Sequence, residues 1–152
     1  MKALELKIHP PIILLLTIIL VYGCSHYLPL LALPSKLFGL HWYLVVAGVL
    51  VSLAGIWEFR KAKTTIDPKS PHKARCLVSG GIYRLTRNPM YLGMQLIIIA
   101  AIFKFGSYYG FIALPCFIFY ITQFQIKPEE RIIEGIFGEE YLQYKKQVRR
   151  WI

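Results

Sequence analysis

The chain has 152 residues, a length typical of one domain, and 56% of them are hydrophobic whereas only 17% are charged. Soluble domains carry about 25% charged residues, so this composition excludes an ordinary soluble protein and indicates an integral membrane protein. The net charge of +10 beside long apolar runs is more typical of contact with anionic lipid than of nucleic-acid binding, which is not expected. The three cysteines, Cys24, Cys76 and Cys116, lack metal-ligand spacing, so no metal site is expected.

Four apolar segments are long enough, or nearly so, to cross a hydrocarbon core of about 30 Å as helices. They are residues 11–31, 41–59, 89–105 and 108–126. In the second segment Gly48, Ser52 and Gly55 lie near one helical face, where small side chains let two helices approach closely. Gly106 begins a short turn between the third and fourth segments, which predicts a tight antiparallel hairpin. We expect the fourth span to be interrupted by Pro115.

The basic residues are distributed unequally between the two sides of these spans. Fourteen of the 18 Lys and Arg residues lie in the loop at 60–88 or in the tail at 127–152. The opposite turns carry only Lys36 and Lys104. Because positively charged segments stay in the cytoplasm, we expect the N-terminus, the loop and the tail to be cytoplasmic in a single-domain, multi-pass protein of the cell membrane.

The tail from residue 127 is expected to form a cytoplasmic amphipathic helix. Its apolar residues recur at steps of three and four, which is the spacing of one helical face, at Ile133, Phe137, Tyr141, Tyr144, Val148 and Trp151. Gly138 is a position at which this helix could divide into two. Two interpretations are equally supported: the helix lies in the headgroup layer, or it folds over the bundle and closes a site.

The segment most informative about chemistry surrounds the start of the third span. Asn88 occupies the N-cap position and Pro89 the first helical position. The start of a helix presents unpaired N–H groups that suit a carboxylate or a phosphate. Just upstream, Gly80 and Gly81 would let the backbone approach a ligand closely. The simpler interpretation is a capped helix that follows a turn.

Glu129 and Glu130 form a second candidate site at the end of the fourth span. Two adjacent carboxylates could hold an ammonium, a sulfonium or a ribose diol, although acids also stabilise the first turn of any helix. The sequence has no local signature of a Ser-His-Asp or Cys-His catalytic set. The spans also lack a titratable group at the membrane midplane, which argues against a proton-coupled transporter.

Taken together, these segments resemble the isoprenylcysteine carboxyl methyltransferase family and its bacterial relatives, a branch of the membrane methyltransferases that includes phospholipid methyltransferases. The resemblance covers residues 64–151 and rests on the order and spacing of three motifs: LVSGGIY at 77–83, RNPMYLG at 87–93, and Glu129-Glu130 followed by FGEEYLQYKK at 137–146. It implies a membrane enzyme that transfers a methyl group from S-adenosylmethionine (SAM) to a small lipophilic or lipid substrate, by carboxylate O-methylation or amine N-methylation. The alternative is a non-catalytic membrane module that recruits acidic lipid or a protein partner.

The resemblance also implies which residues of this chain bind SAM at the cytoplasmic helix ends: Arg75, Cys76, Leu77, Val78, Tyr83, Asn88, Pro89, Met90, Tyr91, Glu129 and Glu130. The helix start would then bind the methionine carboxylate, and Glu129 the ammonium or another polar group of SAM. Arg87, Gln125 and Arg131 are candidates for orienting the substrate. Family members that methylate a prenylcysteine carboxylate have an arginine where this chain has Gln125, so the charge-assisted partner of that carboxylate is missing here.

Overall fold

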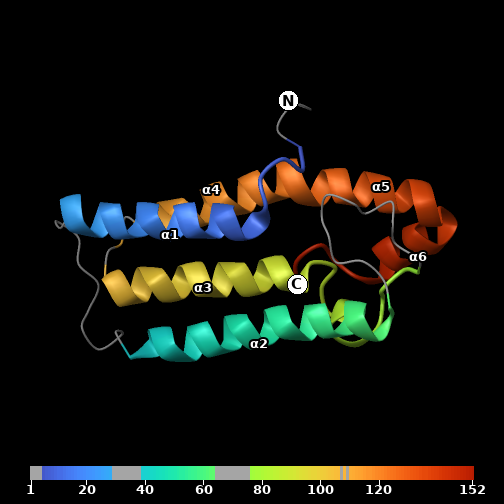
Figure 1. Cartoon of the computed structure of the whole chain (residues 1–152), viewed down its shortest axis with the longest axis horizontal. Helices are drawn as coiled ribbons and strands as arrows, with labels where there is room; N and C mark the ends of the chain where they lie inside the picture. The colour runs from blue at the N-terminus through green and yellow to red at the C-terminus, as the bar shows by residue number, and fades with distance from the viewer. Residues whose placement is uncertain (1–4, 29–38, 64–75, 107, 109) are drawn as a thin grey trace.

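The computed structural model describes residues 5–28, 39–63, 76–106, 108 and 110–152, and within these ranges every regular element is a helix (Figure 1). The elements are α1 Pro10–Tyr27, α2 Leu40–Lys61, the 3-10 helix η4 Gly81–Arg84, α3 Pro89–Phe105, α4 Gly110–Ile121, the π-helical turn η5 Thr122–Ile126, α5 Lys127–Phe137 and α6 Glu139–Gln147. α3 contacts α1, α2 and α4. The starts of α1 and α3 and the end of α2 lie at one end of the bundle, where α5 and α6 extend beyond it (Figure 1).

Among the described residues, three helical stretches are long and apolar enough to cross a membrane: α1, α2 and the continuous helix Gly110–Phe137, which joins α4, η5 and α5. α3 is also apolar but shorter, with 17 residues. The predicted bounds of the second and third spans agree with α2 and α3 to within two residues, whereas residues 29–31 of the first predicted span lie outside the described ranges. The described part of the chain is therefore all-helical, with three to four helices apolar enough to span a bilayer.

Small residues bring α2 and α3 into close contact, as their spacing predicts. A methyl group added at Gly48 would lie 2.7 Å from the carbonyl oxygen of Gly93. One added at Gly55 would lie 3.1 Å from Pro89 and 3.0 Å from Met90. The outward faces of the long helices are apolar instead, since Leu16 of α1 and several large side chains of α2 are exposed. Such faces suit contact with lipid tails.

The fourth helix departs from the sequence-based expectation. α4 continues through Pro115, so the predicted interruption there is wrong, and an apolar helix packed against neighbours tolerates the lost N–H group. The irregular turn is η5, just before Pro128. Proline has no N–H to donate to the carbonyl four residues earlier, here that of Phe124. That carbonyl accepts the N–H of Leu6 instead, at 2.9 Å.

Two glycines with positive φ shape the rest of the chain. Gly106, with φ of 70°, ends α3 and begins the turn of the hairpin. Gly138, with φ of 52°, divides the tail into α5 and α6. α6 then packs over η4, where Tyr83, Tyr141 and Tyr144 are buried together. Of the two arrangements considered for the tail, this packing supports the one in which it folds over the bundle.

Candidate functional site

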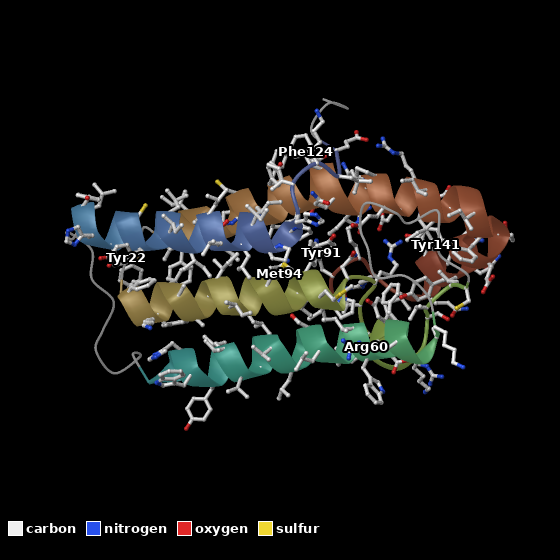
Figure 2. All side chains as sticks on the ribbon, viewed as in Figure 1. Tyr22, Arg60, Tyr91, Met94, Phe124 and Tyr141 are labelled. Carbon is white, nitrogen blue, oxygen red and sulfur yellow. The ribbon has the colours of Figure 1, made fainter. Side chains whose placement is uncertain are left out.

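A cavity of about 470 Å³ lies where the start of α3 meets α2, α5, α6 and the segment before α1. The residues predicted to bind ligand come from three separate parts of the sequence, and most of them line this cavity: Cys76, Leu77, Val78, Tyr83, Arg87, Asn88, Met90, Tyr91, Glu129 and Glu130. Figure 2 shows Tyr91 and Met94 along α3 and Tyr141 of the tail beyond the start of that helix. The fold therefore gathers residues of all three sequence motifs around one cavity.

Three of the predicted residues that the structure describes lie outside the cavity lining, and a fourth is not described. Pro89 packs toward Gly55 of α2. Gln125 is fully buried in η5 and donates from Nε2 to the carbonyl of Ile8 at 2.8 Å. Arg131 is exposed on α5 and forms an ion pair with Glu5. Arg75 lies outside the described residues.

A hydrogen bond connects α3 with α5 across the cavity. The hydroxyl of Tyr91, in the first turn of α3, donates to Oε1 of Glu129 in the first turn of α5 at 2.7 Å. Among the described residues Glu129 has no ion-pair partner. Its carboxylate is therefore oriented by a neutral donor and remains able to pair with a cation that enters the cavity.

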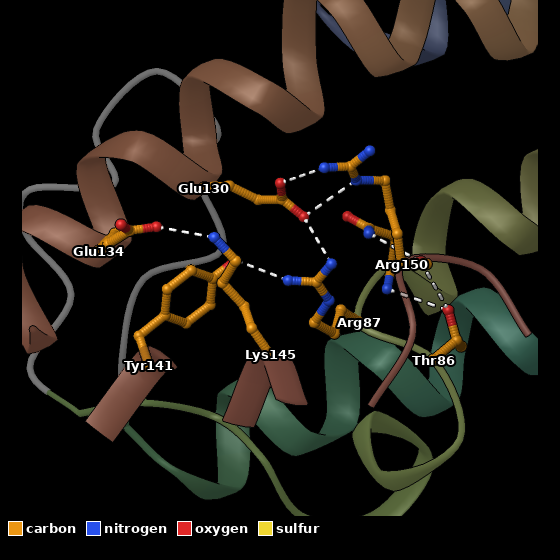
Figure 3. Close-up of polar contacts among 8 residues, drawn as sticks. Thr86, Arg87, Glu130, Glu134, Tyr141, Lys145 and Arg150 are labelled. Carbon is orange, nitrogen blue, oxygen red and sulfur yellow. Dashed lines mark hydrogen bonds and ion pairs between the residues drawn. The ribbon is translucent and has the colours of Figure 1, made fainter. Parts of the chain in front are cut away.

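The neighbouring carboxylate has a different environment, shown in Figure 3. Glu130 is 8% exposed and accepts two hydrogen bonds from Arg150, Nε to Oε1 at 3.1 Å and Nη2 to Oε2 at 2.6 Å. Nη2 of Arg87 lies 3.3 Å from Oε1 of the same carboxylate. Glu134 and Lys145 form a further ion pair at 2.8 Å that connects α5 with α6. Glu130 is therefore already ion-paired within the protein, whereas Glu129 has no ion-pair partner in the part of the chain that the structure describes.

The C-terminal segment holds the start of α3 in place. Nδ2 of Asn88 and Oγ1 of Thr86 both donate to the carbonyl of Arg150, at 2.9 and 3.1 Å. The N–H of Arg87 donates to the carbonyl of Arg149 at 3.0 Å. Asn88 occupies the N-cap position, but its side chain makes no capping hydrogen bond. The interpretation of this motif as a simple capped helix is therefore wrong, since the amide binds the tail instead.

Three buried tyrosines surround this end of the cavity. Burial raises the pKa of Tyr83 well above its ordinary value. It does the same for Tyr141, where the nearby carboxylate of Glu130 adds to the effect, and for Tyr144. The Tyr144 hydroxyl donates to the carbonyl of Tyr83 at 2.7 Å. These phenols stay protonated at neutral pH and act as hydrogen-bond donors or acceptors rather than as bases.

The sequence did not single out several residues that line the cavity. Some lie on the membrane-spanning helices or in η5: Ile56, Phe59, Met94 and Ile126. Ser52 was noted only for close helix packing, and Ile133 and Phe137 only as part of the apolar face of the tail helix. Others, His9, Pro10 and Pro11, precede or begin α1. Tyr141 and Tyr144 also line it, and their place on the apolar face of the predicted tail helix was a usable signal. No local pattern connects His9 with residues more than 60 positions away.

Comparison with known proteins gives a consistent result. An uncharacterized protein of Haemophilus influenzae strain Rd is 43% identical over 63 residues, which are 41% of this chain and all of that relative. No solved structure matches the chain. The sequence profile of the phospholipid methyltransferase family matches residues 37–140, a range that includes both helix starts of the cavity. Because this match spans well over half of the chain, the protein belongs to the phospholipid methyltransferase family.

Proposed function

We propose that the protein is a SAM-dependent methyltransferase of the cell membrane that acts on a small lipophilic or lipid substrate. The observation that carries the proposal is the cavity itself, in which the start of α3 and Glu129, which has no ion-pair partner among the described residues, face apolar and aromatic walls. The basic loop and tail support a topology with four crossings, in which this end of the bundle is cytoplasmic. SAM would then enter from the cytoplasm, and the substrate from the bilayer.

The residues of the cavity fit the chemical groups of SAM. A volume of about 470 Å³ lies within the usual range for small-molecule sites, about 300–1,000 Å³. The ammonium of the methionine part would pair with Glu129, and its carboxylate would meet the first N–H groups of α3, which no side chain caps. Aromatic walls that include Tyr83 and Phe137 suit the adenine.

SAM supplies, when bound, a methyl group already activated by its sulfonium. The protein therefore has to align the acceptor with that methyl group and exclude water. Tyr91 orients Glu129, and apolar side chains of α2 and α3, among them Ile56 and Met94, would hold the lipophilic part of the substrate. Since the buried tyrosines stay protonated, they offer no base. This favours a carboxylate, which needs none, or an amine that arrives neutral.

Calorimetric titration of the detergent-purified protein with SAM and with S-adenosylhomocysteine tests the proposal. We expect one-to-one binding that Glu129→Gln weakens at least tenfold, because the amide cannot neutralise an ammonium. Tyr91→Phe should weaken binding less, since it removes only the hydroxyl that orients the carboxylate. Glu134→Gln is the matched control, an acid on the same helix whose partner is Lys145.

Two results would contradict the proposal. Equal affinity of wild type and Glu129→Gln for both compounds would show that Glu129 does not contact the ligand. Failure of folded wild-type protein to bind either compound, in detergent and again in lipid nanodiscs, would favour the non-catalytic membrane module.

A further inference from the structure

A second pocket lies between η4 and α6, outside the cavity described above. Its volume is about 420 Å³, and its lining comes from two segments at least 60 positions apart: Ser79, Gly80, Arg84, Tyr144, Gln147 and Val148. Of these residues, Tyr144 alone also lines the cavity. The side chains of Ser79, Arg84 and Gln147 are exposed, so a ligand can reach this pocket without entering the cavity.

The polar side chains of this pocket lack partners in the described part of the chain. Ser79, Arg84 and Gln147 form no side-chain hydrogen bond or ion pair there. No acidic side chain is among the lining residues. Glu58 of α2 lies against Gly80 but does not line the pocket. The pocket therefore offers one positive charge and several unused donors, which favours an anion.

A phosphate group matches these donors. The fork of the Arg84 guanidinium can bind two phosphate oxygens at once, and the Ser79 hydroxyl and the Gln147 amide can donate to a third. The position of the pocket also favours phosphate, because only four residues separate η4 from the apolar helix α3. Leu85, next to Arg84, is 72% exposed. An exposed apolar side chain beside an exposed cation is typical of the headgroup layer, where lipid phosphates lie.

We propose that Ser79, Arg84 and Gln147 form a binding site for a phosphate group, and that its occupation holds the tail closed over the cavity. The pocket exists only while α6 packs on η4, because both elements supply part of its lining. A ligand that contacts both elements binds only this closed arrangement and therefore stabilises it. The same helix supplies Tyr141 to the cavity wall, so the phosphate site regulates how completely the cavity is enclosed.

Two sources could supply the phosphate, a soluble ligand or a lipid headgroup, and two pairs of probes distinguish them. The full chain is purified in dodecyl maltoside, a detergent without phosphate. Glycerol 3-phosphate is compared with glycerol, and phosphatidylglycerol with a galactosyl diacylglycerol, which has no phosphate. The measurement is amide hydrogen exchange of α6, because a helix of nine residues is unstable once it leaves η4.

We expect one phosphate probe, or both, to slow the exchange of α6 in wild type, while the two probes without phosphate do not. A bound ligand slows exchange through tail opening by the factor 1 + [L]/Kd, which is roughly tenfold at a ligand concentration of about ten times Kd. Slowing by phosphatidylglycerol alone identifies a lipid headgroup, and slowing by glycerol 3-phosphate identifies a soluble ligand.

Arg84→Gln should weaken the affinity for the effective probe about fivefold, since water and salt limit the attraction of an exposed charge. Because Arg84 has no partner within the described residues, the variant should fold and its exchange without phosphate should equal that of wild type. Arg84→Lys should retain part of the affinity, because an ammonium keeps the charge but not the fork. Lys146→Gln is the matched control, an exposed cation of α6 that does not line the pocket.

Three results would overturn the site: no slowing of wild type by either phosphate probe, equal affinity of wild type and Arg84→Gln, or equal slowing by the probes without phosphate. The site and the proposed function fail separately. If phosphate slows exchange in α6 but SAM does not bind, the phosphate site stands and the SAM-dependent function falls. If SAM binds one-to-one but phosphate leaves α6 unchanged, the function stands and the phosphate site falls.

Discussion

Both terminal segments of the described chain are held at the cavity end of the bundle, but by different chemistry. The segment before α1 is fixed to the fourth helix mainly by neutral hydrogen bonds. Leu6 donates its N–H to the carbonyl of Phe124, and Gln125 donates its side-chain amide to the carbonyl of Ile8, at 2.9 and 2.8 Å. These bonds place His9 in the cavity wall.

The C-terminal segment is held mainly by charge. Arg150 binds Glu130 through two hydrogen bonds, and Arg87 lies against the same carboxylate. Uncharged bonds from Thr86 and Asn88 to the carbonyl of Arg150 complete this contact. A neutral buried bond costs about 1–3 kcal/mol when one partner is removed, whereas an unpaired buried charge costs about 3–5 kcal/mol. The C-terminal contact should therefore be the more sensitive to substitution.

The largest effect should come from Glu130→Ala, which leaves two guanidiniums without their shared carboxylate. We expect a loss of about 3 kcal/mol in the free energy of unfolding, the lower end of the range for buried pairs, because Arg150 is partly exposed and can turn to water. Denaturant unfolding in detergent measures it. Glu140→Ala, an exposed acid on α6, is the control. Equal stability of the two variants would show that the ion cluster does not hold the tail.

Gln125→Leu should have the second largest effect and should act at the other segment. It leaves the carbonyl of Ile8 without its donor in a buried place, which costs about 1–3 kcal/mol. Amide hydrogen exchange of residues 5–9 should become faster, while exchange in α6 stays the same. Gln123→Leu removes an amide two residues earlier, whose exposed hydrogen bond is with Lys127, and it should leave both regions unchanged. Faster exchange in α6 alone would contradict the assignment.

Much of the fold could be predicted from local properties of the sequence. The contacts of the segment before α1 and of the C-terminal segment could not. Hydropathy and the Asn88-Pro89 pair predict α3 with its observed bounds, because the residues that begin the helix and make it apolar lie within the helix or next to it. The cavity residues of α3 and α5 were found because their motifs are local too. The amide bond from Asn88 to Arg150 joins residues 62 positions apart, and no periodicity encodes such a pairing. A proline shows only that one backbone N–H is missing. The sequence therefore did not indicate that α4 continues through Pro115.

Alkaline pH should lower the stability of the contact between η4 and α6, where Tyr83 is buried. The pKa of buried Tyr83 is raised, so the folded state keeps this proton while the unfolded chain loses it above about pH 10. The stability present below that pH therefore falls as the pH rises, by at most about 1.4 kcal/mol per pH unit for one group. Tyr83→Phe should flatten this decline between pH 10 and 11, and Tyr27→Phe, whose ring is 80% exposed, should not. Identical pH profiles for Tyr83→Phe and wild type would contradict the burial of this hydroxyl.

The smallest effect is expected at the one charged contact of the segment before α1. Arg131 pairs with Glu5, but the Arg131 side chain is 59% exposed, so water and salt screen the attraction and an exposed pair of this kind contributes about 0–1 kcal/mol. Arg131→Gln should change the unfolding free energy by less than about 0.5 kcal/mol, and added salt should abolish even that difference. A loss comparable to that of Glu130→Ala would mean that charge, and not the neutral bonds of Leu6 and Gln125, holds this segment at the cavity. The contrast between the two segments would then disappear.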